Sequence, residues 1–283
     1  MEIIAIALSG LLSLASSGGI ILDDLAKKQI GSQIISVEQQ AVRIDNSPNY
    51  RLLQGKIDRL RIASRGVKIE PGLRIAVLDL ETDAIVLKSQ PNLSSINELR
   101  KSLAKPASGA VKLIITEADL NRALQSPEIL ALLETILNQS LIRRAGATNI
   151  PYRLSDLRVE LHSANRGEIR FKLSRPRPSA NIKPDDISGT STVKNRSREL
   201  DFTLESTVEV RDGKTLRLID PQGTVNNRPM SSRLLDGFAV GISDRLNLNS
   251  LESDGILARI LQLEINQDRL KLIGFIRVET KQK

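Results

Sequence analysis

The stretch from Ser36 to Leu87 constrains the fold more than any other part of the chain. Its aliphatic residues recur at every second position in successive short runs, the first of which holds Val42 and Ile44. A period of two places alternate side chains on one face of a β-strand, so the stretch predicts strands that share one apolar face. Residues typical of turns and bulges separate the runs: Asn46, Ser47, Pro48, Gly55, Gly66, Pro71 and Gly72. We therefore expect a curved antiparallel sheet whose apolar face another element must cover.

Two later segments predict β-hairpins. In residues 152–173, apolar and polar residues alternate on both sides of a turn expected at residues 165–167. Residues 261–278 have the same alternation around a turn expected at residues 266–268. The segments LRVELHSANRGEIRFKL and LQLEINQDRLKLIGFI are alike in pattern. This likeness predicts an internal repeat and an elongated, pseudo-symmetric fold.

A further pair of strands is expected around Asp212 and Gly213, which together are a strong signal for a two-residue hairpin turn. The alternation before this turn begins at Leu200. Proline cannot donate a hydrogen bond to a sheet, so Pro221 and Gly223 are expected to end the strand that follows the turn.

Helical spacing marks the segments between the strands. Residues 20–35 predict an amphipathic helix, which either packs on the sheet or lies on a membrane surface. Thr116 and Asp119 form a plausible capping pair for the helix that reaches Leu124. A short helix is expected at residues 96–103, a long one from Pro127 to a stop at Gly146, and another that begins at Ser231 or Ser232 and reaches Leu246.

The long helix after Pro127 is the most hydrophobic one, and its apolar arc is wider than one contact with a sheet requires. Two interpretations follow. The helix lies in a core wrapped by the sheet, or part of its surface lines a groove for lipid. For the second interpretation the candidate lining residues are Leu130, Leu133, Ile136 and Leu137, with Leu234 and Phe238 of the last helix as second choices.

Composition removes most catalytic machinery. The chain has no Cys and one His, which excludes thiol nucleophiles and ordinary zinc sites and leaves His162 as the only histidine base. Asp79, Glu81 and Asp83 share a strand face, but carboxylates on one strand point the same way without converging on a metal ion. We expect no catalytic residue, no metal site and no cofactor.

The chain is basic, with a formal net charge of +8, so we expect an acidic partner. Aromatic residues make up only 2 %, which disfavours stacking on nucleic acid and favours an anionic membrane surface. Residues 174–199 are polar and basic and are expected to form a mobile loop, either a membrane-docking element or a solvated insertion without a partner. The candidate headgroup contacts in this loop are Arg175, Arg177, Lys183, Lys194, Arg196 and Arg198.

The first 19 residues form an apolar run followed by small residues. This pattern is typical of an export or anchoring segment, although a buried N-terminal helix fits it as well, and the run is shorter than the about 20 residues that a membrane-spanning helix needs. We expect residues 20–283 to form a single domain.

The segment from Pro48 to Ile62, with LQGKIDRLRI at its end, resembles a recurring element of the LmeA-like phospholipid-binding proteins, and of their cyanobacterial members in particular. The segment VKLIITEADLNRAL is similar to the next element of that family. The resemblance implies an α+β fold in which an elongated, strongly curved antiparallel sheet wraps long helices, as in tubular lipid-binding proteins. It also implies an apolar cavity, phospholipid binding and a location in the cell envelope.

Two functions follow from these observations. The first is a lipid-binding protein without enzymatic activity, which holds acyl chains in an apolar groove and docks on anionic membrane through basic residues. The alternative is an interaction or scaffold protein with a packed core, whose basic loop binds an acidic partner. Nucleic acid is not an expected partner, and the sequence does not determine the oligomeric state.

Overall fold

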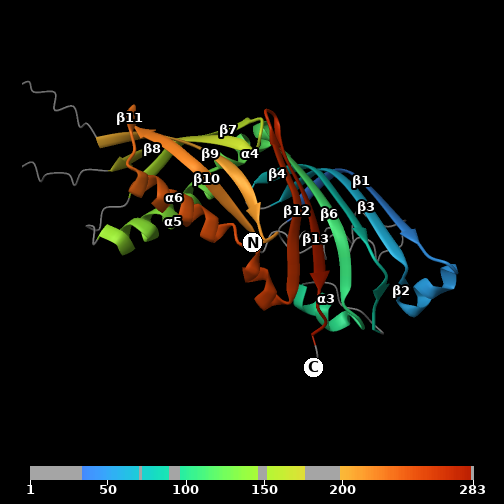
Figure 1. Cartoon of the computed structure of the whole chain (residues 1–283). Helices are drawn as coiled ribbons and strands as arrows, with labels where there is room; N and C mark the ends of the chain where they lie inside the picture. Colours follow the sequence, from blue (N-terminus) through green and yellow to red (C-terminus); the bar gives the residue numbers. More distant parts are fainter. Residues whose placement is uncertain (1–33, 70–71, 89–95, 146–151, 176–197, 282–283) are drawn as a thin grey trace, which may run out of the picture.

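The computed structural model describes residues 34–69, 72–88, 96–145, 152–175 and 198–281, and two antiparallel sheets dominate it (Figure 1). The two sheets lie end to end in an elongated molecule. The apolar segment 1–19 lies outside the described residues, as does nearly all of the helix expected at residues 20–35. The last two residues of that expected helix are in a strand, because the first strand begins at Ile34.

The first sheet has six strands in the order β1-β3-β4-β6-β13-β12. Its N-terminal strands come from the alternating stretch that the sequence singles out, and Gly55, Gly66 and Gly72 all have positive φ, as the predicted turns and bulges require. The strands are β1 (Ile34–Asp45), β3 (Arg59–Ile69), β4 (Leu73–Thr82), β6 (Ala107–Thr116), β12 (Ile256–Asn266) and β13 (Arg269–Val278).

The second sheet has five strands in the order β11-β10-β9-β8-β7. Asp212 and Gly213 form the predicted two-residue turn between two of them, with φ of 54° and 62°. The strands are β7 (Arg153–His162), β8 (Arg166–Arg175), β9 (Arg198–Arg211), β10 (Thr215–Val225) and β11 (Arg228–Pro229). The short strands β2 (Lys56–Ile57) and β5 (Ile85–Val86) pair separately.

The helices begin and end close to the predicted residues. Thr116 caps its helix by accepting a hydrogen bond from the backbone N–H of Asp119, as predicted. The α-helices are α3 (Ile96–Ser102), α4 (Glu117–Leu124), α5 (Pro127–Ala145) and α6 (Ser232–Arg245), and the 3-10 helices are η1 (Asn49–Gln54) and η2 (Leu248–Asp254). No helix in the described ranges combines the length and hydrophobicity needed to cross a membrane.

The six-stranded sheet has a closed core. Alternate residues of β3, such as Leu60 and Ile62, are at most 1 % exposed. Leu99 and Leu103 of the α3 segment and Leu251 of η2 belong to the same buried cluster. This part of the fold is therefore a conventional sheet with short helices packed against one face.

The turns of the five-stranded sheet meet the edge of the six-stranded sheet. In the β7–β8 turn, Asn165 accepts a hydrogen bond from the backbone N–H of Ile265 at 2.8 Å. In the β9–β10 turn, the Gly213 carbonyl accepts one from the N–H of Ile260 at 2.7 Å. Both partners lie on the edge strand β12, so these turns satisfy backbone groups that would otherwise be free to pair with another strand.

Side chains of α4 and α5 form hydrogen bonds to the backbone of the edge strand β7 and of Tyr152 before it, and both helices use the same pair of residue types. Asn121 of α4 accepts from the N–H of Val159 at 2.8 Å and donates to its carbonyl at 2.7 Å, while Glu117 accepts from the N–H of Leu161. In α5, Asn138 bonds both backbone groups of Tyr152, and Glu134 accepts from the N–H of Leu154. Each pair is a Glu followed four residues later by an Asn, one helical turn apart. The two helices thus take the place of a neighbouring strand.

Two expectations are not confirmed, and a third is wrong. The single sheet wrapped round long helices is not confirmed, because the strands form two open sheets, and the long helices α5 and α6 pack against strands of the second. The internal repeat is not confirmed either: one of the two similar hairpins is β7–β8 of the five-stranded sheet and the other is β12–β13 of the six-stranded sheet. Pro221 and Gly223 do not end β10, which continues to Val225 past an irregularity between Ile219 and Gln222 that accommodates the proline.

The turn expected at residues 165–167 lies slightly earlier. Ala164 and Asn165 take the left-handed conformation, with φ of 62° and 58°, and β8 begins at Arg166. Asn adopts this conformation more readily than most residues, and its side chain is then free to bond β12.

Candidate functional site

One face of the five-stranded sheet carries rows of apolar side chains that are direct neighbours across the strands. We call these residues the apolar face. It consists of Leu154, Leu173 and Leu200 in one row, Phe171, Phe202 and Val225 in the next, and Ile169 and Leu204 in the third. The face follows directly from the period of two in β8 and β9.

Aromatic contacts organise the middle of the apolar face. The rings of Phe171 and Phe202 stack with centroids 4.9 Å apart, and Phe238 of α6 meets Phe202 edge to face at 6.2 Å. Three of the four phenylalanines in the chain are therefore gathered here. Such pairs favour a defined arrangement of rings beyond the simple burial of their area.

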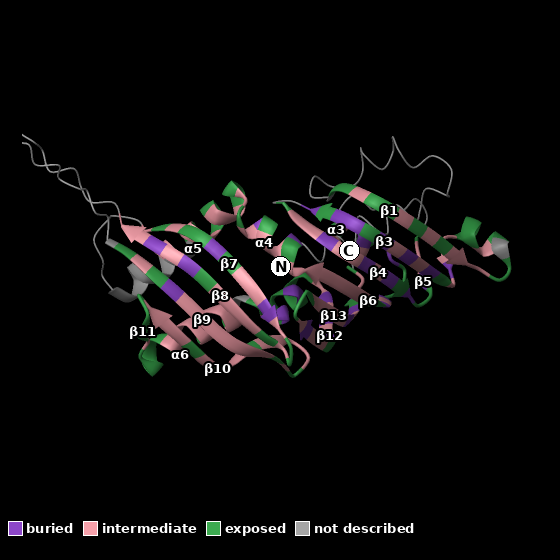
Figure 2. Cartoon of the chain, turned by 90° about the horizontal axis from the view of Figure 1, so that it is seen from above, coloured by how far each residue is buried: buried purple, intermediate pink, exposed green. Residues whose placement is uncertain are grey.

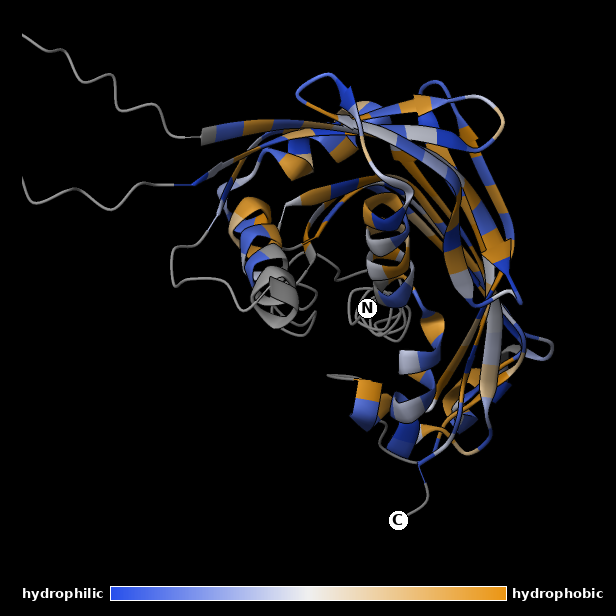
Figure 3. Ribbon diagram, turned by 60° about the vertical axis from the view of Figure 1, so that its left-hand side comes forward, coloured by the Kyte–Doolittle hydropathy of each residue, from blue (hydrophilic) through white to orange (hydrophobic). Residues whose placement is uncertain are grey.

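The two long helices lie on the side of the apolar face but towards opposite edges of the sheet. α5 packs along β7, whereas α6 packs along β10, and β8 and β9 lie between them. Figure 3 shows both helices on the same side of the sheet and apart from each other. The helices therefore flank the central strands.

Burial of the cluster around the apolar face is incomplete. Among the described residues, four of its apolar side chains are buried and eleven are only partly buried. The cluster of the six-stranded sheet has nineteen buried and twelve partly buried members. Figure 2 shows the same contrast, with long runs of intermediate burial on β9 and β10.

The predicted lipid-lining residues divide into three groups. Leu130 and Leu133 of α5 and Phe238 of α6 pack against the cluster of the apolar face. Leu234 is 44 % exposed at the start of α6. Ile136 and Leu137 belong to α5, but their side chains lie outside the described ones.

A glycine permits close packing at one end of the apolar face. A Cβ at Gly223 of β10 would lie 2.8 Å from a methyl carbon of Leu204 and 3.0 Å from the sulfur of Met230. A larger residue would displace both side chains and would also clash with the carbonyl oxygen of Thr203, which lies 2.7 Å from that Cβ position. The sequence treats this glycine as the end of a strand, whereas the structure gives it this packing role.

Basic residues lie at the end of the sheet where β8 ends and β9 begins. Arg175 and Arg198 are backbone partners in the last pair of the ladder, and the guanidinium of Arg175 lies 5.6 Å from the centre of the Tyr152 ring. Figure 1 shows this end of the sheet at the extremity of the molecule. Arg177, Lys183, Lys194 and Arg196, the other predicted headgroup contacts, lie outside the described residues, as does the side chain of Arg198.

The opposite face of the five-stranded sheet is polar and carries several ion pairs. His162 lies there with Glu160 and Glu168, and one potential metal-binding atom from each lies within 4.8 Å of the others. Arg170, however, pairs with both carboxylates, and its pKa is raised by the hydrogen bond to Glu168 and by the charges of Glu168 and Glu160. The carboxylates are thus already engaged by a cation.

The three carboxylates at the end of β4, of which Asp79 and Glu81 lie in the strand and Asp83 follows it, are also engaged. Asp79 pairs with Arg65 and Lys112, and Glu81 lies 3.3 Å from Arg61. Asp83 accepts a hydrogen bond from Ser108 at 2.8 Å. They act in cross-strand contacts on a solvated face, which is the simpler of the two interpretations that the sequence offers.

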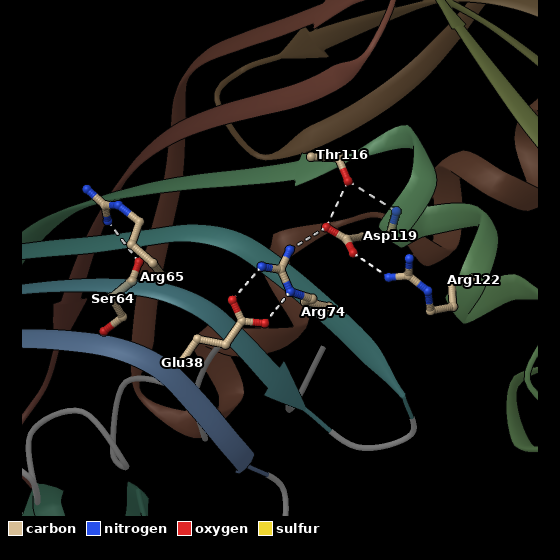
Figure 4. A network of polar contacts seen from close by, with 7 residues as sticks. All are labelled: Glu38, Ser64, Arg65, Arg74, Thr116, Asp119 and Arg122. Carbon is tan, nitrogen blue, oxygen red and sulfur yellow. Dashed lines mark hydrogen bonds and ion pairs between the residues drawn. The ribbon is translucent and has the colours of Figure 1, made fainter.

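A polar network joins the six-stranded sheet to α4 (Figure 4). Arg74 of β4 donates two hydrogen bonds to Glu38 of β1 and one, at 2.9 Å, to Asp119 of α4. Asp119 is only 4 % exposed and also bonds Thr116 and Arg122. The hydrogen bonds to Glu38 and Asp119 raise the pKa of Arg74, so the guanidinium remains charged. This network fixes the helix that holds the edge of the five-stranded sheet.

The prediction from sequence did not select the strand residues of the apolar face as candidate site residues. The helical candidates were chosen for their hydrophobicity, whereas Phe171, Phe202 and Leu204 were assigned to strands without a role. The alternation that identified β8 and β9 contains the missing signal, because it places all three on one face.

The arrangement defines an α+β protein with two antiparallel sheets, one of which has an incompletely buried apolar face flanked by helices. The chain matches the family described as LmeA-like phospholipid-binding over residues 16–275, and it belongs to that family. No curated protein and no solved structure matches it. Membership in a phospholipid-binding family indicates a lipid partner and an association with membranes.

Proposed function

We propose that the protein holds the acyl chains of a phospholipid against the apolar face, between α5 and α6, without catalysing a reaction on the lipid. The observation that carries this proposal is the low proportion of fully buried residues around that face. Burial of acyl carbons is favourable by about 0.8 kcal/mol per CH₂, so an acyl chain offsets the exposure that the protein alone leaves. The family indicates which class of ligand supplies the chain.

The headgroup would lie at the end of the sheet where Arg175 and Arg198 stand opposite each other. This end borders the row of Leu154, Leu173 and Leu200, so an acyl chain on that row has its polar end near the two arginines. The basic segment 174–199 then docks on an anionic membrane of the cell envelope. Phosphate and guanidinium groups form strong, charge-assisted hydrogen bonds.

Native mass spectrometry tests this proposal. Protein purified without detergent should carry a phospholipid, or take one up from liposomes. Leu133→Glu places a carboxylate in the cluster and should abolish uptake, because an unpaired charge in an apolar site is strongly unfavourable. Its matched control is Leu132→Glu on the same helix, where the side chain is already 53 % exposed and uptake should persist.

A thermal unfolding curve for each variant separates loss of binding from loss of folding. Because Leu133→Glu can also destabilise the fold, Phe238→Ala serves as a second variant, which should bind with altered affinity while remaining folded. Repeated preparations of folded wild-type protein that neither carry nor take up phospholipid would refute the proposal. That outcome would favour the interaction or scaffold function.

A further inference from the structure

We propose that η1 is a membrane-inserting tip, which places Leu53, Leu52 and the ring of Tyr50 in the interfacial region of an anionic lipid bilayer. Leu53 is 91 % exposed, Tyr50 61 % and Leu52 44 %. Isolated exposed apolar residues are normal, but three of them within four consecutive positions form a local patch. The inference rests on the proposed lipid-binding function and names a docking element separate from the basic segment 174–199.

The tip is held in place by its own base. Asn46 donates to the Lys56 carbonyl at 2.8 Å and accepts from the N–H of Asp58 at 2.7 Å, which ties the two ends of the loop together. Gly55, with φ of 71°, closes the 3-10 helix, and its N–H bonds the Leu52 carbonyl at 3.0 Å. The apolar side chains are therefore presented to solvent by an ordered turn.

Charge around the tip suits an anionic bilayer. Five basic and two acidic side chains lie between Arg43 and Arg61, and Arg51 is inside η1 itself. Asp58 pairs with Arg51 at 2.7 Å, and Asp45 pairs with Arg43 at 2.7 Å. Glu81, the further acid at this site, pairs with Arg61, and basic groups remain in excess. Lipid phosphates would meet this excess while the leucines enter the acyl region.

Most of the residues behind the tip are polar or charged. An open depression of about 440 Å³ next to η1 is lined by Ile44, Asp45, Asn46, Ser47, Asp58 and Arg59. An apolar end above a polar base has the order of groups that a bilayer interface presents, and tyrosine is enriched at that level. In Figure 1 the tip lies beside β2, at the opposite end of the molecule from β11.

The chain contains no tryptophan, so the fluorescence of one introduced tryptophan reports on its own position alone. Leu53→Trp introduces a single indole at the tip, and its emission should move to shorter wavelength on addition of phosphatidylglycerol–phosphatidylcholine vesicles and be quenched by brominated lipid. The matched control is Leu261→Trp, on β12 at 65 % exposure, whose emission should not respond. Unchanged emission at position 53 in the presence of vesicles overturns the inference.

Vesicle sedimentation gives the second measurement. Leu53→Ser should weaken binding to the same vesicles by about tenfold or more, since one leucine side chain no longer enters the bilayer. Arg51→Gln should weaken it by about fivefold, and this effect should disappear with pure phosphatidylcholine. Equal binding of Leu53→Ser and wild-type protein contradicts insertion.

The outcomes distinguish this inference from the proposed function. A short-chain phospholipid supplied without vesicles should still bind to Leu53→Ser in native mass spectrometry, because the apolar face is intact. If Leu53→Ser binds vesicles as well as the wild-type protein does, and lipid is still bound, only the proposal that η1 inserts into the bilayer is refuted. Retained insertion of Leu53→Trp in a protein that holds no lipid refutes only the apolar face as a lipid site.

Discussion

The six-stranded and five-stranded sheets have the same alternating pattern but different degrees of burial. Leu60 of β3 is fully buried, with an exposed fraction of 0 %, whereas Leu204 at the same kind of alternating position in β9 is only partly buried. Nineteen apolar residues are buried in the first cluster and four in the second, among the residues described. The six-stranded sheet therefore has a closed core, whereas the apolar face of the five-stranded sheet is only partly covered.

The difference comes from what lies over each sheet. α3 and η2 contribute Leu99, Leu103 and Leu251 to the interior of the six-stranded sheet. Over the five-stranded sheet, α5 and α6 pack towards opposite edges, and side chains of α5 are also used to satisfy the backbone of β7. Helices that act as edge partners are displaced from the centre of a sheet, which leaves the middle strands only partly covered.

The largest expected effect is on stability. Leu60→Ala should lower the free energy of unfolding by about 2–5 kcal/mol, because it leaves a cavity in a closed core. Leu204→Ala should lower it by clearly less, since part of that side chain is already in contact with water. Urea denaturation of both variants measures the difference. Equal losses would show that the apolar face is packed as tightly as the core.

The second prediction concerns the lipid-bound state. Phospholipid at about 100 times its dissociation constant should stabilise the protein by about 2.7 kcal/mol, and hydrogen exchange should slow in β8 and β9 more than in β3 and β4. The reason is that only the five-stranded sheet gains new cover. A lipid that slows exchange in β3 and β4 but leaves β8 and β9 unchanged would place the ligand on the wrong sheet.

Much of the fold could be predicted because local rules decide it. The period of two located the strands, the Asp212–Gly213 turn was identified, and Thr116 was recognised as a cap. The division into two sheets could not be predicted, since it depends on hydrogen bonds such as that between Asn165 and Ile265, which are a hundred residues apart. Pattern alone does not say which strand edges meet.

The candidate site could be predicted only on its helical side. Leu133 and Phe238 were found from hydrophobicity and do pack against the apolar face. Phe171 and Phe202 were not selected, because a strand that lines a site and a strand that fills a core have the same alternation. The exposed leucines of η1, Leu52 and Leu53, were not selected either, because they stand outside the alternating runs that predicted strands.

The third prediction addresses the edge of the five-stranded sheet. Asn121→Ala removes both side-chain hydrogen bonds to Val159 and should lower the free energy of unfolding by about 1–3 kcal/mol. Asn138→Ala should have a similar effect at Tyr152. Thr135→Ala is the control, since that hydroxyl bonds the Ala131 carbonyl of its own helix and faces solvent. If all three variants unfold alike in urea, the edge does not depend on these side chains.

The smallest expected effect on stability comes from a change of pH. It alters the ionic contacts around Arg74 and leaves the apolar contacts unchanged. The hydrogen bonds from Arg74 hold the pKa of Glu38 below its ordinary value, and burial opposes them. A carboxyl with a lowered pKa in the folded state stabilises the protein above the pKa of the unfolded chain. That contribution is lost as the pH falls through the lower, folded-state pKa.

Glu38→Gln should therefore reduce stability near neutral pH and make unfolding less sensitive to acid below about pH 4.3, the usual pKa of glutamate. Glu209→Gln, at an exposed position of β9, is the matched control and should keep the acid response of the wild-type protein. Thermal unfolding across the acid range measures both. An unchanged acid response in Glu38→Gln would show that the pair of Glu38 with Arg74 makes no measurable contribution to stability, and Asp119 would then be the partner that matters for the contact between Arg74 and α4.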